Sequence, residues 1–181
     1  MTTPSSDTGA LRPGARLPDL TLLDSDGYPR RLLDLPGGDP LVLHLHRGWF
    51  CPKDRTYLRR VLLPFAGELG VAYARLVSVS VEPPEVQAAY RAGLDATWTF
   101  LADPTRVLQT TLDLREWTDT VHDPYVPTVA VVRPDGIVHE TWNGYWYLGR
   151  PGADELRRSL REVTRQVRRD WVVERPAGTR A

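Results

Sequence analysis

Apolar residues alternate with other residues in several short segments, a spacing that is typical of β-strands. In the clearest of these, residues 41–46, three leucines lie on one face and Val42, His44 and His46 lie on the other. A segment this short and this apolar is expected in the centre of a sheet, where both faces are covered. The same reasoning predicts further strands at residues 17–23, 75–81, 98–101, 128–132 and 137–142.

Between these strands, apolar residues recur every three or four positions, which indicates amphipathic helices. The first helix begins at Pro52 and contains Pro64, so we expect a kink or a break there. Further helices are predicted at residues 83–92, 105–112 and 153–169, the second of them capped by Asp103. The last two strands flank a Pro-Asp-Gly turn and predict a hairpin. The sequence therefore predicts an α/β fold with a central mixed β-sheet flanked by helices, a terminal β-hairpin and a C-terminal helix.

Length and composition fit one globular domain with short tails. The chain has 181 residues, of which 41% are hydrophobic and 25% are charged, as in ordinary globular domains. We expect a flexible N-terminal tail at residues 1–13, because its few apolar side chains cannot offset the entropy that is lost on ordering. The domain is then expected at residues 14–170, followed by a C-terminal tail at residues 171–181.

Charge and hydropathy argue against two classes of partner. The 23 basic residues balance the 23 acidic ones, so no positive surplus attracts nucleic acid. No apolar run approaches the roughly 18 residues of a membrane span, and the first residues lack the apolar centre of a secretory signal. We therefore expect no nucleic-acid partner, no membrane partner and a cytoplasmic location.

Cys51 is the only cysteine, so the chain cannot form an internal disulfide or run a dithiol cycle. It lies between a predicted strand and the helix that begins at Pro52, which places it at the helix N-cap. There the unpaired amides of Lys53 and Asp54 and the helix dipole favour a thiolate, and Arg47 adds positive charge nearby. We expect the thiol pKa to fall to about 7 or below. The alternative is a small buried apolar residue, a common role of free cysteine.

Several motifs together resemble a known family. They are Leu-Pro-Asp-Leu at 17–20, Arg-Gly-Trp-Phe-Cys-Pro at 47–52, Val-Pro-Thr at 126–128 and Pro-Asp-Gly at 134–136. Over residues 14–169 the chain resembles the alkyl hydroperoxide reductase / thiol-specific antioxidant (redoxin, peroxiredoxin-like) family. The resemblance implies a thioredoxin-like fold, with Cys51 at the position of the reactive cysteine and Pro127 as a cis-proline that faces it.

The chain departs from the family pattern at four positions. Asp54 stands where thioredoxin-like members carry a second cysteine. Gly48 and His44 stand where typical peroxiredoxins carry Thr or Ser and Pro, and Pro127 occupies the position of their activating Arg. Dithiol exchange is thereby excluded, and Arg47 becomes the candidate cation for polarising a peroxide.

The leading hypothesis is a single-cysteine redoxin-like oxidoreductase that needs no cofactor. The Cys51 thiolate would reduce a hydroperoxide or a similar small electrophile, and an external thiol would act as the reductant. Arg47 would stabilise the anion, and His46 or His122 would carry protons near neutral pH. The remaining candidates, expected to bind substrate or form the wall of the site, are Trp49, Pro127, Tyr125 and Asp54. The aromatic run at residues 142–147 could wall an apolar pocket or form a homodimer contact.

The histidines support an alternative hypothesis, a metal-dependent enzyme or metal-binding protein. His44 and His46 lie on one strand face with Cα atoms roughly 6.6–7 Å apart, so both imidazoles could converge on one ion. Cys51 follows five residues later, and the resemblance places His122 in a loop that returns beside it. Such a set suits Cu, Zn or Fe. Histidines with ordinary hydrogen-bond partners, or a scaffold kept only for binding, are the simpler alternatives.

Overall fold

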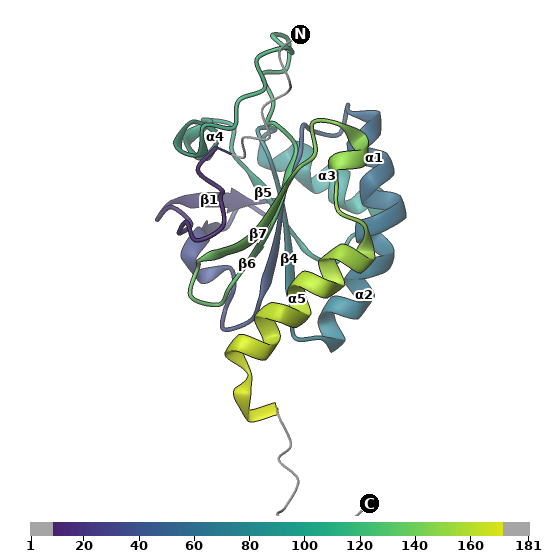
Figure 1. Ribbon diagram of the computed structural model, residues 1–181. Helices are drawn as coiled ribbons and strands as arrows, with labels where there is room; N and C mark the ends of the chain where they lie inside the picture. Colours follow the sequence, from purple (N-terminus) through teal and green to yellow (C-terminus); the bar gives the residue numbers. More distant parts are fainter. Residues whose placement is uncertain (1–8, 172–181) are drawn as a thin grey trace, which may run out of the picture.

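The computed structural model describes residues 9–171, in which seven strands form one sheet (Figure 1). Their order is β2-β1-β5-β4-β3-β6-β7. The bounds are β1 Thr21–Asp24, β2 Pro29–Arg31, β3 Leu41–Leu45, β4 Arg75–Ser80, β5 Thr99–Ala102, β6 Thr128–Val132 and β7 Val138–Asn143. Strands β3, β4 and β5 run parallel, whereas β6 and β7 form an antiparallel hairpin beside β3. The predicted mixed sheet with a terminal hairpin is confirmed.

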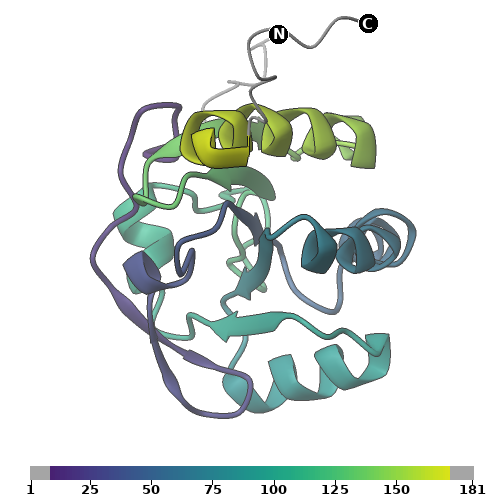
Figure 2. The ribbon, with the colours of Figure 1, turned by 90° about the horizontal axis from the view of Figure 1, so that it is seen from below.

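Helices cover both faces of this sheet (Figure 2). They are α1 Pro52–Tyr57, α2 Leu63–Val71, α3 Pro84–Leu94, α4 Val107–Leu112 and α5 Ala153–Val167. One core cluster contains buried residues of α2, α3 and α5, and the other contains buried residues of α4 and of the segment before β1. Within the described residues, no helix is long and apolar enough to cross a bilayer.

The predicted alternation of β3 is confirmed. Leu41, Leu43 and Leu45 pack into the core on the α4 side, and Val42 packs into the core on the opposite face. His44 is buried and makes ring contact with Tyr57 of α1. The central strand therefore runs through the middle of the domain and delivers the next residues to the edge of the sheet.

Pro64 disturbs its helix as predicted. The backbone forms a π-helical turn, Leu58–Leu62, between α1 and α2, and Pro64 is the second residue of α2. Proline has no N–H to donate to the preceding turn and its ring crowds that turn. A single widened turn absorbs this misfit without ending the helix.

The structure corrects two expectations about boundaries. Leu11, expected in a flexible tail at residues 1–13, is only 1% exposed, and its carbonyl accepts a 2.7 Å hydrogen bond from Thr141 Oγ1. Residues 1–8 of that tail and residues 172–181 lie outside the described residues. Asp103 is not the N-cap residue of α4, which begins at Val107 after Arg106. Its buried carboxylate nevertheless accepts the amide of Gln109 in the first turn at 2.9 Å, and it also accepts the Tyr125 hydroxyl at 2.6 Å.

Candidate active site around Cys51

Cys51 occupies the position that the sequence predicts, at the N-cap of α1 just beyond the end of β3. Its backbone is extended (φ −78°, ψ 115°), and Pro52 supplies the first helical residue, a position that tolerates the missing N–H. The Arg55 amide donates to the Cys51 carbonyl at 3.1 Å, which closes the first turn. The side chain is only 2% exposed. The sulfur is therefore held at a helix start and is nearly closed off from bulk water.

The expected fall in the pKa of Cys51 is wrong. Burial raises the pKa of the thiol, and the negative charge of Asp54 raises it further. The amides of Lys53 and Asp54 oppose this rise, but neither donates a capping hydrogen bond to the sulfur. Desolvation disfavours the charged form of any acid, so Cys51 rests as a thiol at neutral pH.

The loop that leads into Cys51 is fixed by Glu82, which follows β4. Both Glu82 carboxylate oxygens accept the Trp49 amide at 3.1 Å, and Oε2 also accepts from Ser80 Oγ and Gln87 Nε2, each at 3.1 Å. Burial raises the pKa of Glu82. Gly48 has φ +138°, and a Cβ there would lie 2.7 Å from Glu82 Oε1. The glycine at the family's Thr or Ser position therefore makes room for this carboxylate.

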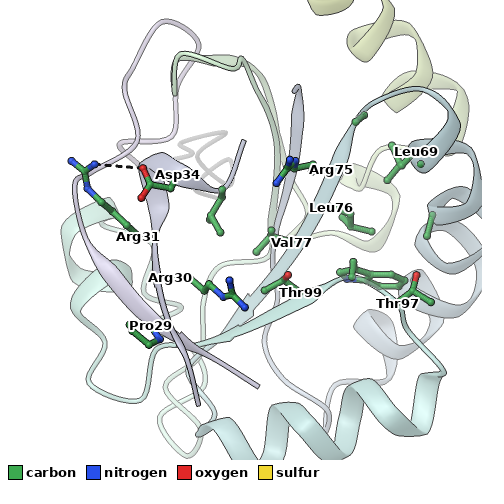
Figure 3. Close-up of a pocket in the computed structure, with 15 residues that line it drawn as sticks. Pro29, Arg30, Arg31, Asp34, Leu69, Arg75, Leu76, Val77, Thr97 and Thr99 are labelled. Carbon is green, nitrogen blue, oxygen red and sulfur yellow. Dashed lines mark hydrogen bonds and ion pairs between the residues drawn. The ribbon is translucent and has the colours of Figure 1, made fainter. Parts of the chain in front are cut away.

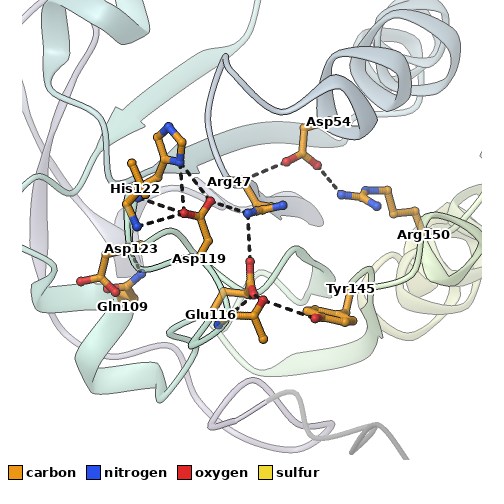
Figure 4. A network of polar contacts seen from close by, with 11 residues as sticks. Arg47, Asp54, Gln109, Glu116, Asp119, His122, Asp123, Tyr145 and Arg150 are labelled. Carbon is orange, nitrogen blue, oxygen red and sulfur yellow. Dashed lines mark hydrogen bonds and ion pairs between the residues drawn. The ribbon is translucent and has the colours of Figure 1, made fainter.

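Asp54, predicted as a wall of the site, lies at the centre of a buried polar network (Figure 4). Its Oδ2 accepts the Arg47 amide at 2.9 Å, and its Oδ1 pairs with the guanidinium of Arg150. Both side chains of this ion pair are almost completely buried, at 0% and 2% exposure. Arg150 also donates to the Gly144 carbonyl at 2.7 Å. Nothing in the sequence points to Arg150, which stands alone in a loop far along the chain from Cys51.

Arg47 extends from the same loop towards two acidic residues (Figure 4). Its Nη2 pairs with Asp119 at 2.6 Å and with Glu116 at 3.0 Å. Its buried Nε, like the Nε of Arg150, has no hydrogen-bond partner among residues 9–171. Two buried guanidinium donors without partners therefore lie on either side of Asp54, a pattern that often marks a ligand or water site.

A cavity of about 190 Å³ opens among these residues. It is lined by Arg47, Lys53, Glu116, Thr118, Pro127, Tyr145, Trp146 and Arg150. It is smaller than the 300–1,000 Å³ typical of pockets for drug-sized ligands and fits a small reactant. Two of its lining residues flank Cys51 in the sequence.

Of three residues predicted to form the wall of the site, only one lines this cavity. Pro127 lines the cavity, but residues 9–171 contain no cis peptide bond, so the expected cis-proline is wrong. The trans form is the intrinsically preferred state, and it leaves the Pro127 carbonyl accepting the Gly144 amide at 2.6 Å. Trp49 points elsewhere and lines a groove with Tyr90. Tyr125 does not line the cavity, because it is buried in the α4-side core and donates to Asp103.

The predicted metal ligands do not assemble. His44 and His46 stack with ring centroids 5.1 Å apart, and His44 Nδ1 lies 3.2 Å from Ser78 Oγ. His122 instead stacks on Phe50 at 3.7 Å, outside the core. In the described part of the chain, no three His, Cys, Asp or Glu side chains are arranged to hold a metal ion. The set of His44, His46, Cys51 and His122 is therefore wrong as a metal site.

The two histidines predicted to carry protons, His46 and His122, lie in different surroundings. Burial lowers the pKa of His46 to about 4 and that of His44 well below its usual value, so the imidazoles of His44 and His46 are neutral at physiological pH. His122 is largely exposed, and its Nδ1 lies 3.0 Å from Asp119 Oδ2.

A second cavity, of about 550 Å³, lies at the opposite edge of the sheet, where β4 and β5 begin (Figure 3). Its three arginines are engaged by carboxylates: Arg30 by Asp24 at 2.7 Å, Arg31 by Asp19 at 2.6 Å and Arg75 by Asp39 at 3.4 Å. No cysteine or histidine lines it. We therefore place the candidate chemistry at Cys51.

Three solved structures of named proteins have a similar fold. Peroxidoxin BcpB from Mycobacterium tuberculosis is 21% identical, with a TM-score of 0.68 over 87% of this chain and 98% of that one. AhpC from Enterococcus faecalis is 20% identical, with a TM-score of 0.70 over 91% and 98%. PrxQ from Xylella fastidiosa is 18% identical, with a TM-score of 0.68 over 86% and 96%. The predicted thioredoxin-like α/β fold is confirmed.

Sequence comparison places the chain in a family. A search of curated proteins found no match. The model of the AhpC/TSA family, however, matches residues 13–141, which include Cys51, Asp54 and Pro127. Because this match spans most of the chain and agrees with the fold, the protein belongs to the AhpC/TSA family.

Proposed function

We propose that this protein is a single-cysteine thiol peroxidase. Cys51 attacks one oxygen of a hydroperoxide, the O–O bond breaks, and the other oxygen leaves as an alcohol or water. The sulfur is thereby oxidised to a sulfenic acid. A first external thiol forms a mixed disulfide with it and releases water, and a second thiol frees Cys51 and leaves as a disulfide. The sulfur and the peroxide exchange electrons directly, so the reaction needs no cofactor.

One observation carries this proposal: the only cysteine of an AhpC/TSA chain lies at the N-cap of α1, directly beyond the central strand β3. The relatives that share the fold are named as a peroxidoxin, AhpC and PrxQ. Since the chain has no second cysteine, the reductant must come from outside it. A homodimer and a cytoplasmic location stay predictions.

The cavity that Arg47, Lys53 and Arg150 line offers a place for the peroxide, because two of these residues lie within four positions of Cys51 in the sequence. Arg47 and Arg150 bring guanidinium groups to it, and the buried Nε of each has no hydrogen-bond partner among residues 9–171. Donors that are fixed before the reaction stabilise the negative charge that develops on the leaving oxygen. Arg47 thus keeps its predicted role as the polarising cation, and Arg150 joins it.

The proposal is tested by mixing the reduced protein with peroxide in a stopped-flow instrument. We expect a change in tryptophan fluorescence at least roughly a hundredfold faster than the reaction of free cysteine, because one positioned donor contributes about 10²-fold or more. Dimedone should then trap one sulfenic acid per chain. Cys51→Ser should abolish both signals. A wild-type rate equal to that of free cysteine would rule out peroxidase activity.

A further inference from the structure

The proposed chemistry requires Cys51 to lose a proton, and the structure restricts where that proton can go. The thiolate is the attacking species, but the sulfur belongs to a side chain that is 2% exposed. The leaving oxygen of the peroxide also needs a proton to depart as a neutral alcohol. One group beside the sulfur that accepts the first proton and supplies the second would serve both needs.

Most titratable groups around Cys51 are already committed. Glu82 is occupied by the Trp49 amide, Ser80 and Gln87. His122 is stacked on Phe50, outside the core. His46 is the exception: its buried ring packs against Tyr90 and Phe100, burial lowers its pKa to about 4, and its two nitrogens have no hydrogen-bond partner among residues 9–171.

Asp54 is placed differently. It is the third residue of the helix that Cys51 caps, a position from which a side chain reaches back towards the N-cap. Its carboxylate is fully buried; the Arg47 amide donates to Oδ2, and the Arg150 guanidinium pairs with Oδ1. An ionised carboxylate has about four acceptor sites, so acceptor sites remain for the thiol. Its influence on Cys51 is seen in the thiol pKa, which burial raises most and the Asp54 charge raises further.

We propose that Asp54 is the proton carrier of this active site, taking the thiol proton as Cys51 attacks and passing it to the leaving oxygen. The S–O bond forms as the O–O bond breaks, the sulfur is oxidised, the peroxide is reduced, and the proton ends on the alcohol. Arg150 acts as a positioning residue, because its buried guanidinium pairs with Oδ1 of this carboxylate and fixes its orientation. This inference rests on the proposed peroxidase function.

The test compares two reactions of Cys51 at pH 7 in the wild type and in Asp54→Asn. Peroxide reduction needs the proton relay, so we expect its rate constant to fall by about 10²-fold or more. Alkylation by iodoacetamide releases iodide, which needs no proton, and loss of the Asp54 charge favours the thiolate. We therefore expect alkylation to become faster in the same variant. The exposed Asp113→Asn serves as the matched control and should change neither rate.

A change in the same direction for both reactions would overturn the proton-carrier role, because a purely structural effect or a purely electrostatic one acts on both alike. Asp54→Glu keeps the charge and should recover most of the peroxide rate. If Asp54→Asn does not fold, the wild type in D₂O decides. A slower peroxide reaction with unchanged alkylation supports the proposal, and equal effects refute it. If wild-type Cys51 reacts with peroxide no faster than free cysteine, the proposed peroxidase function itself is refuted, and not only the role of Asp54.

Discussion

At the scale of single residues, burial decides the chemistry of this site more than residue type does. The sequence places Cys51 at a helix N-cap, where a lowered thiol pKa is expected, yet burial raises that pKa. Burial likewise lowers the pKa of His46 to about 4, so its imidazole is neutral at physiological pH. A sequence motif names the groups that can react, but solvent access sets the charge that they carry.

The neutral state of His46 should make stability depend on pH. The pKa of His46 is about 4 in the folded protein and about 6.5 when unfolded, so the unfolded chain binds more protons between these values. The stability that comes from keeping His46 neutral is therefore fully present above about pH 6.5, and it is lost as the pH falls towards 4. We expect the free energy of unfolding to be about 2 kcal/mol lower at pH 5 than at pH 7 from this residue.

Urea titrations at the two pH values measure this difference. His46→Leu removes the titrating group and should reduce the loss between pH 7 and pH 5. The matched control His139→Gln changes a partly buried histidine that lies beside Glu162, and it should leave most of the loss in place. An equal loss in the wild type and in His46→Leu would contradict the assignment.

At the scale of elements, the end of β4 holds the loop that follows β3. Glu82 accepts the Trp49 amide with both carboxylate oxygens, and Gly48 leaves room for that carboxylate. The two strands are parallel neighbours, so their carboxyl ends meet at the same edge of the sheet. The approach to Cys51 is thus set by contacts between elements, and not by the loop sequence alone.

Gly48→Ala tests this arrangement. Its φ of +138° is unfavourable for alanine, and the new Cβ would meet Glu82 Oε1 at 2.7 Å. We expect a loss of about 1–3 kcal/mol in the free energy of unfolding and slower alkylation of Cys51, measured by denaturation and with iodoacetamide. Gly67→Ala is the matched control, since Gly67 lies within α2 with open space around it. It should stabilise the protein slightly; a similar loss in both variants would refute the argument.

At the scale of the whole molecule, the sequence predicted what depends on local pattern. The alternation in residues 41–46 and the turn at residues 134–136 identified the central strand and the hairpin, because strand and turn preferences act over a few residues. The pairing of Asp54 with Arg150 joins positions 96 residues apart. No local spacing encodes such a contact, so the sequence pointed to Asp54 but not to its partner Arg150. Tyr125 was misplaced for the same reason, since its partner Asp103 is 22 residues away.

The N-terminal limit of the domain can be tested with Leu11. This side chain is 1% exposed within the core on the α4 side. We expect Leu11→Ala to lower the free energy of unfolding by about 2–5 kcal/mol, as for other buried leucines, in a denaturant titration. Leu148→Ala, at a side chain that is 93% exposed, should change it by about 0.5 kcal/mol or less. An unchanged denaturation midpoint for Leu11→Ala would instead support a domain that begins at residue 14.

The buried ion pair also limits how this chain could acquire a second cysteine. Position 54 is where thioredoxin-like members carry one, but replacing Asp54 alone would strand the guanidinium of Arg150 in the interior. Breaking such a pair costs about 3–5 kcal/mol, a large share of the stability of an average domain. Changing position 150 first would strand the Asp54 carboxylate in the same way. The two positions are therefore epistatic: an evolutionary route to dithiol chemistry must alter them together.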